Sequence, residues 1–348
     1  MKLLELLPEL EEGGVERHVV SLSTALSERG HQVHIVSGGG KLERELPAAV
    51  THWRMPVYRK NPVSILRCAW RVALMTRNEG FQLFHAHSRV PAWVAYIASC
   101  IVRVPFVVTA HFFSGNRSRW IYRPYRRAAR VLCVSHSVEQ AMADCFSGNT
   151  VVVRNGLPPP SVRWRGPRDD GSQCLLFIGR LTSVKGLQDV LRVLSSLKSA
   201  GGWRLDVLGD SPLRSELEDI AHKGGIDGRV FFHGFRDDTD TWLERCSCLL
   251  FPSYHEGMSL TLARAIQMKT PIIASDIPSV RELCSAHETL VPPGDLKGWR
   301  KALEHFLTGK RVPVGFDPRT VPSLEEMTTT TEDVYRQVVN EHHRRSHT

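Results

Sequence analysis

Short apolar runs alternate with segments of helical periodicity along most of this chain. Residues 2–7 form the first apolar run, residues 15–26 carry apolar side chains at every third or fourth position, and residues 31–36 return as a second strand-like run. Runs of this length fit buried strands, whereas the wider spacing fits amphipathic helices. Strands that alternate with helices are typical of a parallel sheet, because each helix returns the chain to the edge where the previous strand began. We therefore predict an α/β fold with doubly wound sheets.

The alternation occurs twice, on either side of a turn-forming segment. Asn155-Gly156, followed by three prolines at 158–160, is turn and linker chemistry, so we place the domain boundary there. We predict a first domain over 1–157, a linker over 158–171, a second domain over 172–322 and a C-terminal helix over 323–348 that can cross back to the first domain. The predicted strands are 2–7, 31–36, 81–85, 105–109, 131–134, 151–153, 174–178, 204–208, 230–232, 248–251, 272–274 and 289–291. The predicted helices are 15–30, 62–78, 91–102, 187–198, 212–223, 239–246, 258–266, 295–307 and 325–342.

Composition describes a globular protein of the cytosol. The chain has 348 residues, of which 42% are hydrophobic and 23% charged, which is enough for two domains with separate cores. Its eight cysteines are scattered through apolar runs, a pattern that indicates reduced thiols and not a disulfide framework. The N-terminus is too short and too charged for a signal peptide. The apolar run at 91–102 is too short to span a bilayer, so any membrane contact should be peripheral.

The positive charge lies in the first half of the chain. Residues 1–157 hold 20 Lys and Arg against 11 Asp and Glu, whereas the remainder holds 25 of each. We therefore expect the first domain to meet an anionic partner. The candidate surface for an acceptor or a membrane is an arginine set interleaved with aromatic residues: Arg117, Arg119, Arg123, Arg126, Arg127 and Arg130. A solvated face is the alternative, and nucleic acid is not expected because no nucleic-acid-binding motif accompanies the set.

Residues 248–266 are predicted to form a strand, a loop and a helix. The apolar run Cys248–Phe251 is followed by residues 258–266 with apolar side chains at helical spacing. Glu256 and Gly257 then fall at the start of the helix, where backbone N–H groups lack partners within the helix. Such a helix start suits an anion or a polyhydroxylated ligand.

Five motifs, in this order, resemble those of the retaining glycosyltransferases of family 4. They are Glu12–His18, Val108–His111, Asn155-Gly156, Gly179–Gly186 and the loop around Glu256. The resemblance covers residues 1–307 and implies two Rossmann-like domains that face each other across a cleft, the GT-B arrangement. It also implies that the first domain binds the acceptor and that the second binds the nucleotide sugar.

The resemblance implies roles for the residues of these motifs. Glu256 and His111 are expected to contact the donor sugar, and Glu256 would also stabilise the positive charge that develops at the anomeric carbon. Arg180 and Lys185 suit a diphosphate, because they are two cations in a loop that contains glycine. The expected donor-binding residues are Gly13, Gly14, Arg180, Lys185, Gly257, Met258, Ser259, Leu260 and Arg264. His85 and His87 also lie at a strand end, and we expect them only to pack there.

Arg264 departs from the family pattern. The family has a second Glu at this position, eight residues after the first, where its carboxylate accepts hydrogen bonds from the ribose hydroxyls. A guanidinium can only donate hydrogen bonds. We therefore expect Arg264 to pair with a phosphate or with a nearby acid, of which Glu256 is one candidate.

No metal or other cofactor is expected beyond the nucleotide sugar as co-substrate. Asp238 and Asp240 resemble the metal-binding pair of other glycosyltransferases, but they precede a helix and are predicted to cap it. Cys246 and Cys248 lack a second pair of ligands at the spacing of a zinc site.

These observations predict a retaining, metal-independent hexosyltransferase on the cytoplasmic face of a membrane. It would move a sugar from a nucleotide-diphosphate donor to a hydroxyl of a glycolipid, lipopolysaccharide or other cell-surface glycan precursor. Two alternatives remain open at this stage: a catalytically weak nucleotide-sugar-binding protein, suggested by Arg264, and a nucleotide-sugar epimerase of the same fold.

Overall fold

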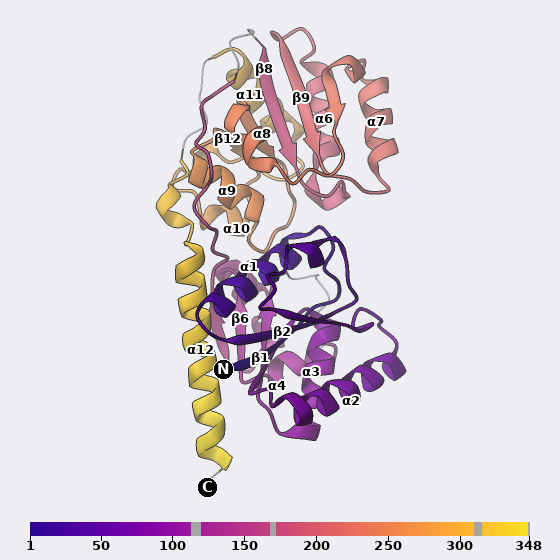
Figure 1. Cartoon of the computed structure of the whole chain (residues 1–348). Coiled ribbons are helices and arrows are strands. Elements are labelled where there is room, and N and C mark those ends of the chain that lie inside the picture. Colours follow the sequence, from indigo (N-terminus) through magenta and orange to yellow (C-terminus); the bar gives the residue numbers. More distant parts are fainter. Residues whose placement is uncertain (113–119, 168–171, 310–314, 347–348) are drawn as a thin grey trace. The chain divides into compact units, whose positions relative to one another are not determined.

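The computed structural model describes residues 1–112, 120–167, 172–309 and 315–346 (Figure 1). The chain divides into two compact units. Unit 1 comprises Met1–Pro158 together with Pro322–Thr348, and unit 2 comprises Pro159–Val321. Unit 1 is thus built from two separate stretches of the sequence, with unit 2 inserted between them.

Unit 1 contains a seven-stranded parallel sheet with the strand order β3-β2-β1-β4-β5-β6-β7. Its strands are β1 Lys2–Leu6, β2 Gln32–Ser37, β3 Thr51–Arg54, β4 Leu83–His87, β5 Phe106–Ala110, β6 Arg130–Cys133 and β7 Thr150–Val152. Its α-helices are α1 Gly14–Glu28, α2 Pro62–Glu79, α3 Arg89–Val102, α4 Arg123–Arg127, α5 His136–Ala141 and α12 Leu324–Ser346. Both β4 and β5 are buried at every position, as expected for strands inside a sheet that helices cover on both faces.

The strand order of unit 1 reverses beside β1. From β1 the sheet grows outward to β2 and β3, and the chain then returns to the other side of β1 with β4. Ligands of open parallel sheets bind beyond the carboxyl ends of the strands at such a reversal. The ends of β1 and β4 therefore mark the candidate binding edge of unit 1.

Helix α12 completes the core of unit 1 (Figure 1). Its side chains Met327, Tyr335 and Val338 belong to the same buried cluster as Leu3 of β1 and Leu22 of α1. Apolar residues at helical spacing give α12 one buried face, which packs beside α1. A segment more than 300 residues from β1 in the sequence thus helps to hold β1 in place.

Unit 2 contains a five-stranded parallel sheet with the order β10-β9-β8-β11-β12. Its strands are β8 Gln173–Ile178, β9 Trp203–Leu208, β10 Val230–Phe232, β11 Cys248–Phe251 and β12 Ile272–Ala274. Its α-helices are α6 Leu187–Ser196, α7 Arg214–Lys223, α8 Thr239–Arg245, α9 Leu260–Met268, α10 Pro278–Arg281 and α11 Leu296–Leu307. The order reverses between β8 and β11, which marks the candidate binding edge of this unit. The predicted architecture of two doubly wound Rossmann-like sheets is confirmed.

The predicted strand at 289–291 is wrong. A 3-10 helix occupies His287–Thr289, and Val291 makes only an isolated bridge to Ser275. A run of three apolar or β-branched residues is too short for its pattern to distinguish a strand from an extended connection.

Among the described residues, no helix combines the length and the apolar character that crossing a bilayer requires.

Candidate functional site

In unit 2, the loops that follow β8 and β11 meet where the strand order reverses. The first loop runs from Gly179 to Gly186 and the second from Pro252 to Ser259. They are joined by a hydrogen bond of 2.8 Å that the Tyr254 amide donates to the Val184 carbonyl. The two predicted donor-binding loops therefore form one continuous surface at the carboxyl edge of the sheet.

Lys185 and Glu256 form an ion pair across these loops. Lys185 Nζ lies 2.5 Å from Glu256 Oε1, and Ser253 Oγ donates to the same oxygen at 2.8 Å. The Lys185 side chain is 23% exposed and that of Glu256 is 13% exposed, so both can still be reached by a ligand. A ligand with phosphate and hydroxyl groups could break this ion pair and bind both side chains. The Lys185 ammonium would bind a phosphate, and the Glu256 carboxylate would accept hydrogen bonds from hydroxyls.

Arg180 extends this cationic surface. Its side chain is exposed, and within the described ranges it has no ion-pair partner. The structure therefore brings Lys185 and Glu256 into contact and leaves the Arg180 guanidinium in the same loop open to an anion.

The approach of the two loops depends on Gly186. Its φ of 72° lies in the left-handed region, and a Cβ added there would stand 2.1 Å from the carbonyl oxygen of Pro252. Only glycine avoids both the strained backbone and the collision. The contact between the loops is therefore set by backbone shape as well as by the Lys185–Glu256 pair.

Helix α9 begins at Leu260, four residues after Glu256. Ser259 is its N-cap, and the Ser259 hydroxyl accepts a hydrogen bond of 3.4 Å from the Leu262 amide. Gly257 and Met258 are buried just before the cap, and Leu260 is the first residue of the helix. Of the predicted donor-binding residues, Ser259 and Leu260 therefore lie at the helix start, where backbone N–H groups suit an anion or a hydroxyl ligand, and Gly257 and Met258 lie in the loop just before it.

Arg264 does not pair with Glu256, whose Oε1 contacts Lys185 and Ser253. Arg264 Nε instead lies 3.3 Å from Asp240 Oδ1 on the neighbouring helix α8, and Arg264 Nη1 donates to Gln267 at 3.1 Å. The pKa of Arg264 is lowered by burial, and Asp240 partly offsets this effect. The nearby acid that pairs with Arg264 is therefore Asp240 of α8.

The predicted cap of α8 by Asp238 or Asp240 is also wrong. Asp238 occupies the N-cap position, but its side chain makes no cap hydrogen bond and accepts instead from Arg236 at 2.8 and 2.9 Å. Asp240 is in the first turn and pairs with Arg264. Each carboxylate therefore neutralises a guanidinium.

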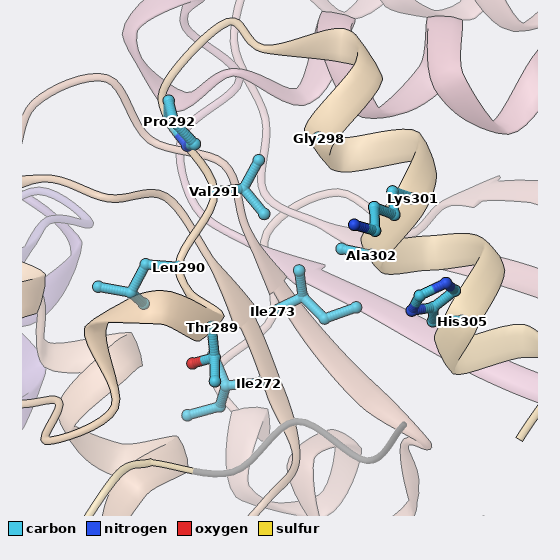
Figure 2. A pocket seen from close by; sticks show the side chains of 10 residues that line it. All are labelled: Ile272, Ile273, Thr289, Leu290, Val291, Pro292, Gly298, Lys301, Ala302 and His305. Carbon is cyan, nitrogen blue, oxygen red and sulfur yellow. The ribbon is translucent and has the colours of Figure 1, made fainter. Parts of the chain in front are cut away.

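A separate cavity of about 190 Å³ lies beneath α11 in unit 2. Figure 2 shows that Lys301 and His305 of α11 border it together with Ile272 and Ile273 from the region of β12. None of the predicted site residues lines it. A cavity of this size is also too small for a nucleotide sugar, so it does not compete with the loops after β8 and β11.

In unit 1, His111 follows β5 and is held by a buried chain of hydrogen bonds. His87 Nδ1 lies 3.1 Å from His111 Nε2, and His87 Nε2 lies 2.7 Å from Glu5 Oε2. Glu5 and His87 are almost completely buried. The expectation that His87 only packs at the strand end is therefore wrong, because its two ring nitrogens join His111 to a buried acid.

The charge of the Glu5 carboxylate determines which ring nitrogens of His87 and His111 carry a proton. Burial opposes its charge, but His85 and His87 outweigh that effect and lower the pKa of Glu5, so it is ionised and can only accept. His87 Nε2 must then donate to Glu5. Burial lowers the pKa of His87 to about 4, so the ring is neutral and its Nδ1 accepts from His111 Nε2. This arrangement leaves His111 Nδ1 as a hydrogen-bond acceptor.

Helix α12 contributes Tyr335 to the same network. The Tyr335 hydroxyl donates to Glu5 Oε1 at 3.1 Å and lies 2.5 Å from His85 Nδ1. His85 Nε2 lies 2.7 Å from Thr109 Oγ1 of β5. His85, like His87, therefore has a specific bonding role. The sequence does offer a signal for the network, since Glu5 is the only acid in the apolar run 2–7 and a buried acid requires partners.

His18 of α1 packs against this group without a hydrogen bond from either ring nitrogen. Its ring centroid lies 4.9 Å from that of His111, and burial lowers its pKa to about 3. Nitrogen atoms of His18, His87 and His111 lie within 4.8 Å of one another, as do ligand atoms of Glu5, His85 and His87. Either trio offers donors that suit a transition metal, but the hydrogen bond between His87 and His111 directs their facing nitrogens at each other and not at a common point. The absence of a metal stays a prediction.

The other predicted residues of unit 1 are more scattered. Gly13 is the N-cap of α1, and Gly14 is its first residue. Arg123 and Arg127 are exposed on α4, Arg126 is half-buried, and Arg130 Nη2 is 2.7 Å from Glu341 of α12. Arg117 and Arg119 lie outside the described residues.

Two of the three aromatic residues around this arginine set are part of the core. Tyr122 is 1% exposed and Tyr125 is 3% exposed, whereas Trp120 is 68% exposed. The predicted surface therefore has cations but only one accessible aromatic side chain.

Two family models match this chain, one on each unit. The model described as Glycosyltransferase Family 4 matches residues 12–159, and the model described as Glycosyl transferases group 1 matches residues 172–309.

Curated relatives and solved structures match over most of their length. Glycogen synthase of Mycobacterium tuberculosis is 26% identical, with 86% of this chain and 84% of that protein covered. A lipopolysaccharide core biosynthesis glycosyltransferase of Rhizobium meliloti is 23% identical, with 85% and 86% covered. The crystal structure of the Anabaena protein HepE in complex with UDP-glucose superposes with a TM-score of 0.75 at 17% identity, over 99% of this chain and 98% of that one.

Proposed function

This chain is a glycosyltransferase of the family 4 type, and we propose that it transfers a hexose or related sugar from a nucleotide-diphosphate sugar, with retention of anomeric configuration. The acceptor is a hydroxyl of a glycolipid, lipopolysaccharide or other cell-surface glycan precursor. The observation that carries the proposal is the Lys185–Glu256 pair, where a cation and an acid meet beside the start of α9 at the strand reversal of unit 2.

The names of similar proteins support both substrates. The Anabaena structure holds UDP-glucose, which is a nucleotide-diphosphate sugar. The Rhizobium relative is named for lipopolysaccharide core biosynthesis, and the mycobacterial relative is named for the synthesis of glycogen. The Anabaena structure thus supports a nucleotide sugar as donor, and the two names support a glycan as the product.

The side chains of unit 2 suit the charges of such a reaction. Lys185 and Arg180 would bind the diphosphate and stabilise the negative charge that it gains as the bond to the sugar breaks. Glu256 would accept hydrogen bonds from sugar hydroxyls and stabilise the positive charge that develops at the anomeric carbon. Two protein cations can supply the charge that a metal supplies in other enzymes, so we propose a metal-independent reaction.

The histidine chain of unit 1 suits a sugar hydroxyl. Because His111 Nε2 donates to His87, its Nδ1 is available to accept a hydrogen bond from a hydroxyl group. Glu5 and His87 would act as positioning residues that keep this nitrogen free of a proton.

We further propose that the enzyme works at the cytoplasmic face of a membrane, where lipid-linked acceptors are presented. The excess positive charge of residues 1–157 supports an anionic partner for unit 1. Arg123 and Arg127 of α4 are exposed and available to such a partner.

Transfer assays with single variants test the donor site. We expect Lys185→Ala, Arg180→Ala and Glu256→Ala each to reduce kcat/KM by at least about tenfold, equivalent to roughly 1.4 kcal/mol of transition-state stabilisation. The assay would follow release of nucleoside diphosphate from a panel of nucleotide sugars, with and without acceptor.

Lys223→Ala is the matched control, because Lys223 is an exposed lysine of α7 in the same unit. If the three site variants and Lys223→Ala all kept wild-type turnover, the donor site would have to lie elsewhere. Donor binding without any acceptor-dependent release would instead favour a nucleotide-sugar-binding protein.

A further inference from the structure

Helix α2 exposes a stripe of large apolar side chains. Val63, Leu66, Trp70 and Leu74 are 53%, 56%, 56% and 43% exposed. Their spacing of three, four and four residues places them along one side of the helix. Trp53 and Tyr58, which precede α2, are also exposed. Six of the twelve large apolar side chains that are exposed in the described part of the chain therefore lie between residues 53 and 74.

The opposite side of α2 is fully used in packing. Cys68, Ala69, Val72 and Ala73 are at most 2% exposed, and α2 packs against α3 on the outside of unit 1 (Figure 1). The helix is also well defined at its ends, since the Asn61 side chain caps its start and Gly80 ends it in the left-handed conformation. The exposed stripe therefore belongs to a helix whose other face is buried in unit 1 and whose two ends are capped.

Cations border this stripe, and acids are absent from it. Arg59, Lys60, Arg67, Arg71 and Arg77 are exposed, and no acidic residue occurs between 53 and 78. Within the described ranges none of these five cations has an ion-pair partner. Arg67 and Arg71 follow Leu66 and Trp70 directly, so they lie along one edge of the stripe.

We propose that the surface formed by Trp53, Tyr58, Val63, Leu66, Trp70, Leu74 and the five cations, here called the α2 surface, docks on a bilayer of anionic lipids. Leucine, valine and tryptophan would enter the boundary between head groups and acyl chains, and the arginines would pair with lipid phosphates. This inference rests on the membrane location in the proposed function. It assigns the contact to α2 and not to Arg123 and Arg127 of α4, because Trp120 is the only exposed aromatic side chain between residues 120 and 130.

Charge argues against a second copy of the chain as the occupant. A two-fold symmetric contact through the α2 surface would place the Arg67–Arg71 edges of two copies near each other without acids between them. Nucleic acid would satisfy the arginines, but its phosphates would leave the central aliphatic side chains against a polar partner. A lipid surface satisfies both features at once.

The place of α2 in the fold supports a role in acceptor delivery. Because α2 follows β3, its first turn starts at the carboxyl edge of the sheet, the edge at which β4 and β5 end and His111 lies. A membrane contact there would keep the same edge of unit 1 close to the lipid surface.

Sedimentation of the full chain with vesicles tests the proposal. The vesicles contain phosphatidylcholine either alone or mixed with phosphatidylglycerol. We expect binding to the mixed vesicles, which added salt weakens. Leu66→Ser combined with Trp70→Ser should lower the partition coefficient by at least about tenfold, and Arg67→Glu combined with Arg71→Glu should do the same.

Two controls accompany these variants. Phe231→Ser removes an aromatic side chain of similar exposure (44%) from unit 2 and should bind vesicles as the wild type does. Arg123→Glu combined with Arg127→Glu tests α4, and a loss confined to this pair would overturn the assignment to α2. Circular dichroism and thermal unfolding of each variant show whether it is folded. If the apolar double variant does not fold, the Arg67→Glu and Arg71→Glu variant still tests the proposal, because both of its side chains are exposed.

Other outcomes would also overturn the proposal. These are equal vesicle binding by the wild type and the α2 variants, no binding by the wild type, concentration-dependent dimers that the α2 variants abolish, or loss of duplex DNA binding in these variants without loss of vesicle binding. Release of nucleoside diphosphate with a water-soluble acceptor separates the two proposals. If that activity persists while vesicle binding fails, the membrane surface is wrong and the transferase assignment stands.

Discussion

Glu5 is the single residue on which the proton arrangement of the histidine group depends. In Glu5→Gln, the side-chain amide can donate as well as accept a hydrogen bond. His87 Nε2 then no longer has to carry a proton in order to bond to residue 5. We expect nitrogen NMR of histidine-labelled protein to show His111 protonated at Nε2 in the wild type and in a mixture of tautomers in Glu5→Gln. Asp206→Asn is the control, because Asp206 holds His233 in unit 2 in a similar way, 2.8 Å from its Nε2.

The same spectra decide between a hydrogen-bonded chain and a metal site. If equimolar Zn²⁺ shifted the resonances of His18, His87 and His111 together, or if the purified protein already carried zinc, the three rings would act as ligands and the tautomer argument would fail. Glu5→Asp serves as the conservative variant. Partial recovery of the wild-type tautomer in Glu5→Asp would show that an acid is needed at this position.

Arg264 and Asp240 should behave as a coupled pair. Arg264→Glu would place two acids about 3 Å apart in a largely buried position, and we expect a loss of stability on the order of 1–2 kcal/mol. Adding Asp240→Asn should recover part of that loss. Urea unfolding of the two single variants and the double variant measures the coupling, and simple additivity would mean that the contact has no energetic role.

At the scale of elements, the meeting of the loops after β8 and β11 should depend on Gly186. Gly186→Ala combines a left-handed backbone with a collision against the Pro252 carbonyl, so we expect a loss of at least about 2 kcal/mol in the stability of unit 2. Gly201→Ala is a close control, because Gly201 has the same φ of 72° but its nearest neighbouring atom is 3.8 Å away. Equal losses in urea unfolding would show that backbone strain alone, and not the loop contact, sets the cost.

Local patterns predicted the elements that build the unit 2 site. The apolar run at 248–251 and the helical spacing after Met258 predicted a strand, a loop and a helix, and these are β11 and α9; Glu256 lies in the loop, three residues before the N-cap Ser259. Strand β3 was not predicted, because Thr51–Arg54 lies at the sheet edge and three of its four side chains are exposed. Strands without a buried face lack the apolar pattern on which such predictions rest.

Contacts between distant segments could not be predicted in this way. The partner of Glu5 on α12 is 330 residues away, and Asp240 and Arg264 meet only because α8 and α9 are neighbours. The resemblance to a family supplied Lys185, Glu256 and His111. The sequence marks Glu5 as an acid in an apolar run and His87 as a strand-end residue, but their hydrogen bonds to each other, to His111 and to Tyr335 are known only from the packing of unit 1.

At the scale of the whole molecule, acid should destabilise unit 1. The pKa of His87 is lowered from its ordinary value of 6.5 to about 4, and that of His18 to about 3, both mainly by burial. Between about pH 6.5 and about pH 4 the unfolded chain therefore binds more protons than the folded chain, so the free energy of unfolding falls as the pH falls. Below the ordinary pKa of Glu5, 4.5, its lowered pKa acts in the same direction.

Urea unfolding at a series of pH values measures this effect. His18→Leu should make the dependence on pH less steep in the window from 6.5 downward, since it removes one group that takes up a proton on unfolding. A midpoint that stayed constant or rose toward acid pH would show that these histidines are already protonated in the folded protein.

The division of unit 1 between two stretches of sequence also sets an order of events during translation. Domains are made at about 5–20 residues per second and fold as units, so the 163 residues of unit 2, Pro159–Val321, are all synthesised before α12 exists. Until then, Glu5 has no Tyr335, and the apolar face of α1 has no α12 to cover it. Unit 2 can therefore fold first on the ribosome. The sheet of unit 1, although synthesised earlier, is completed only when α12 is made, and until then part of its core is accessible to chaperones.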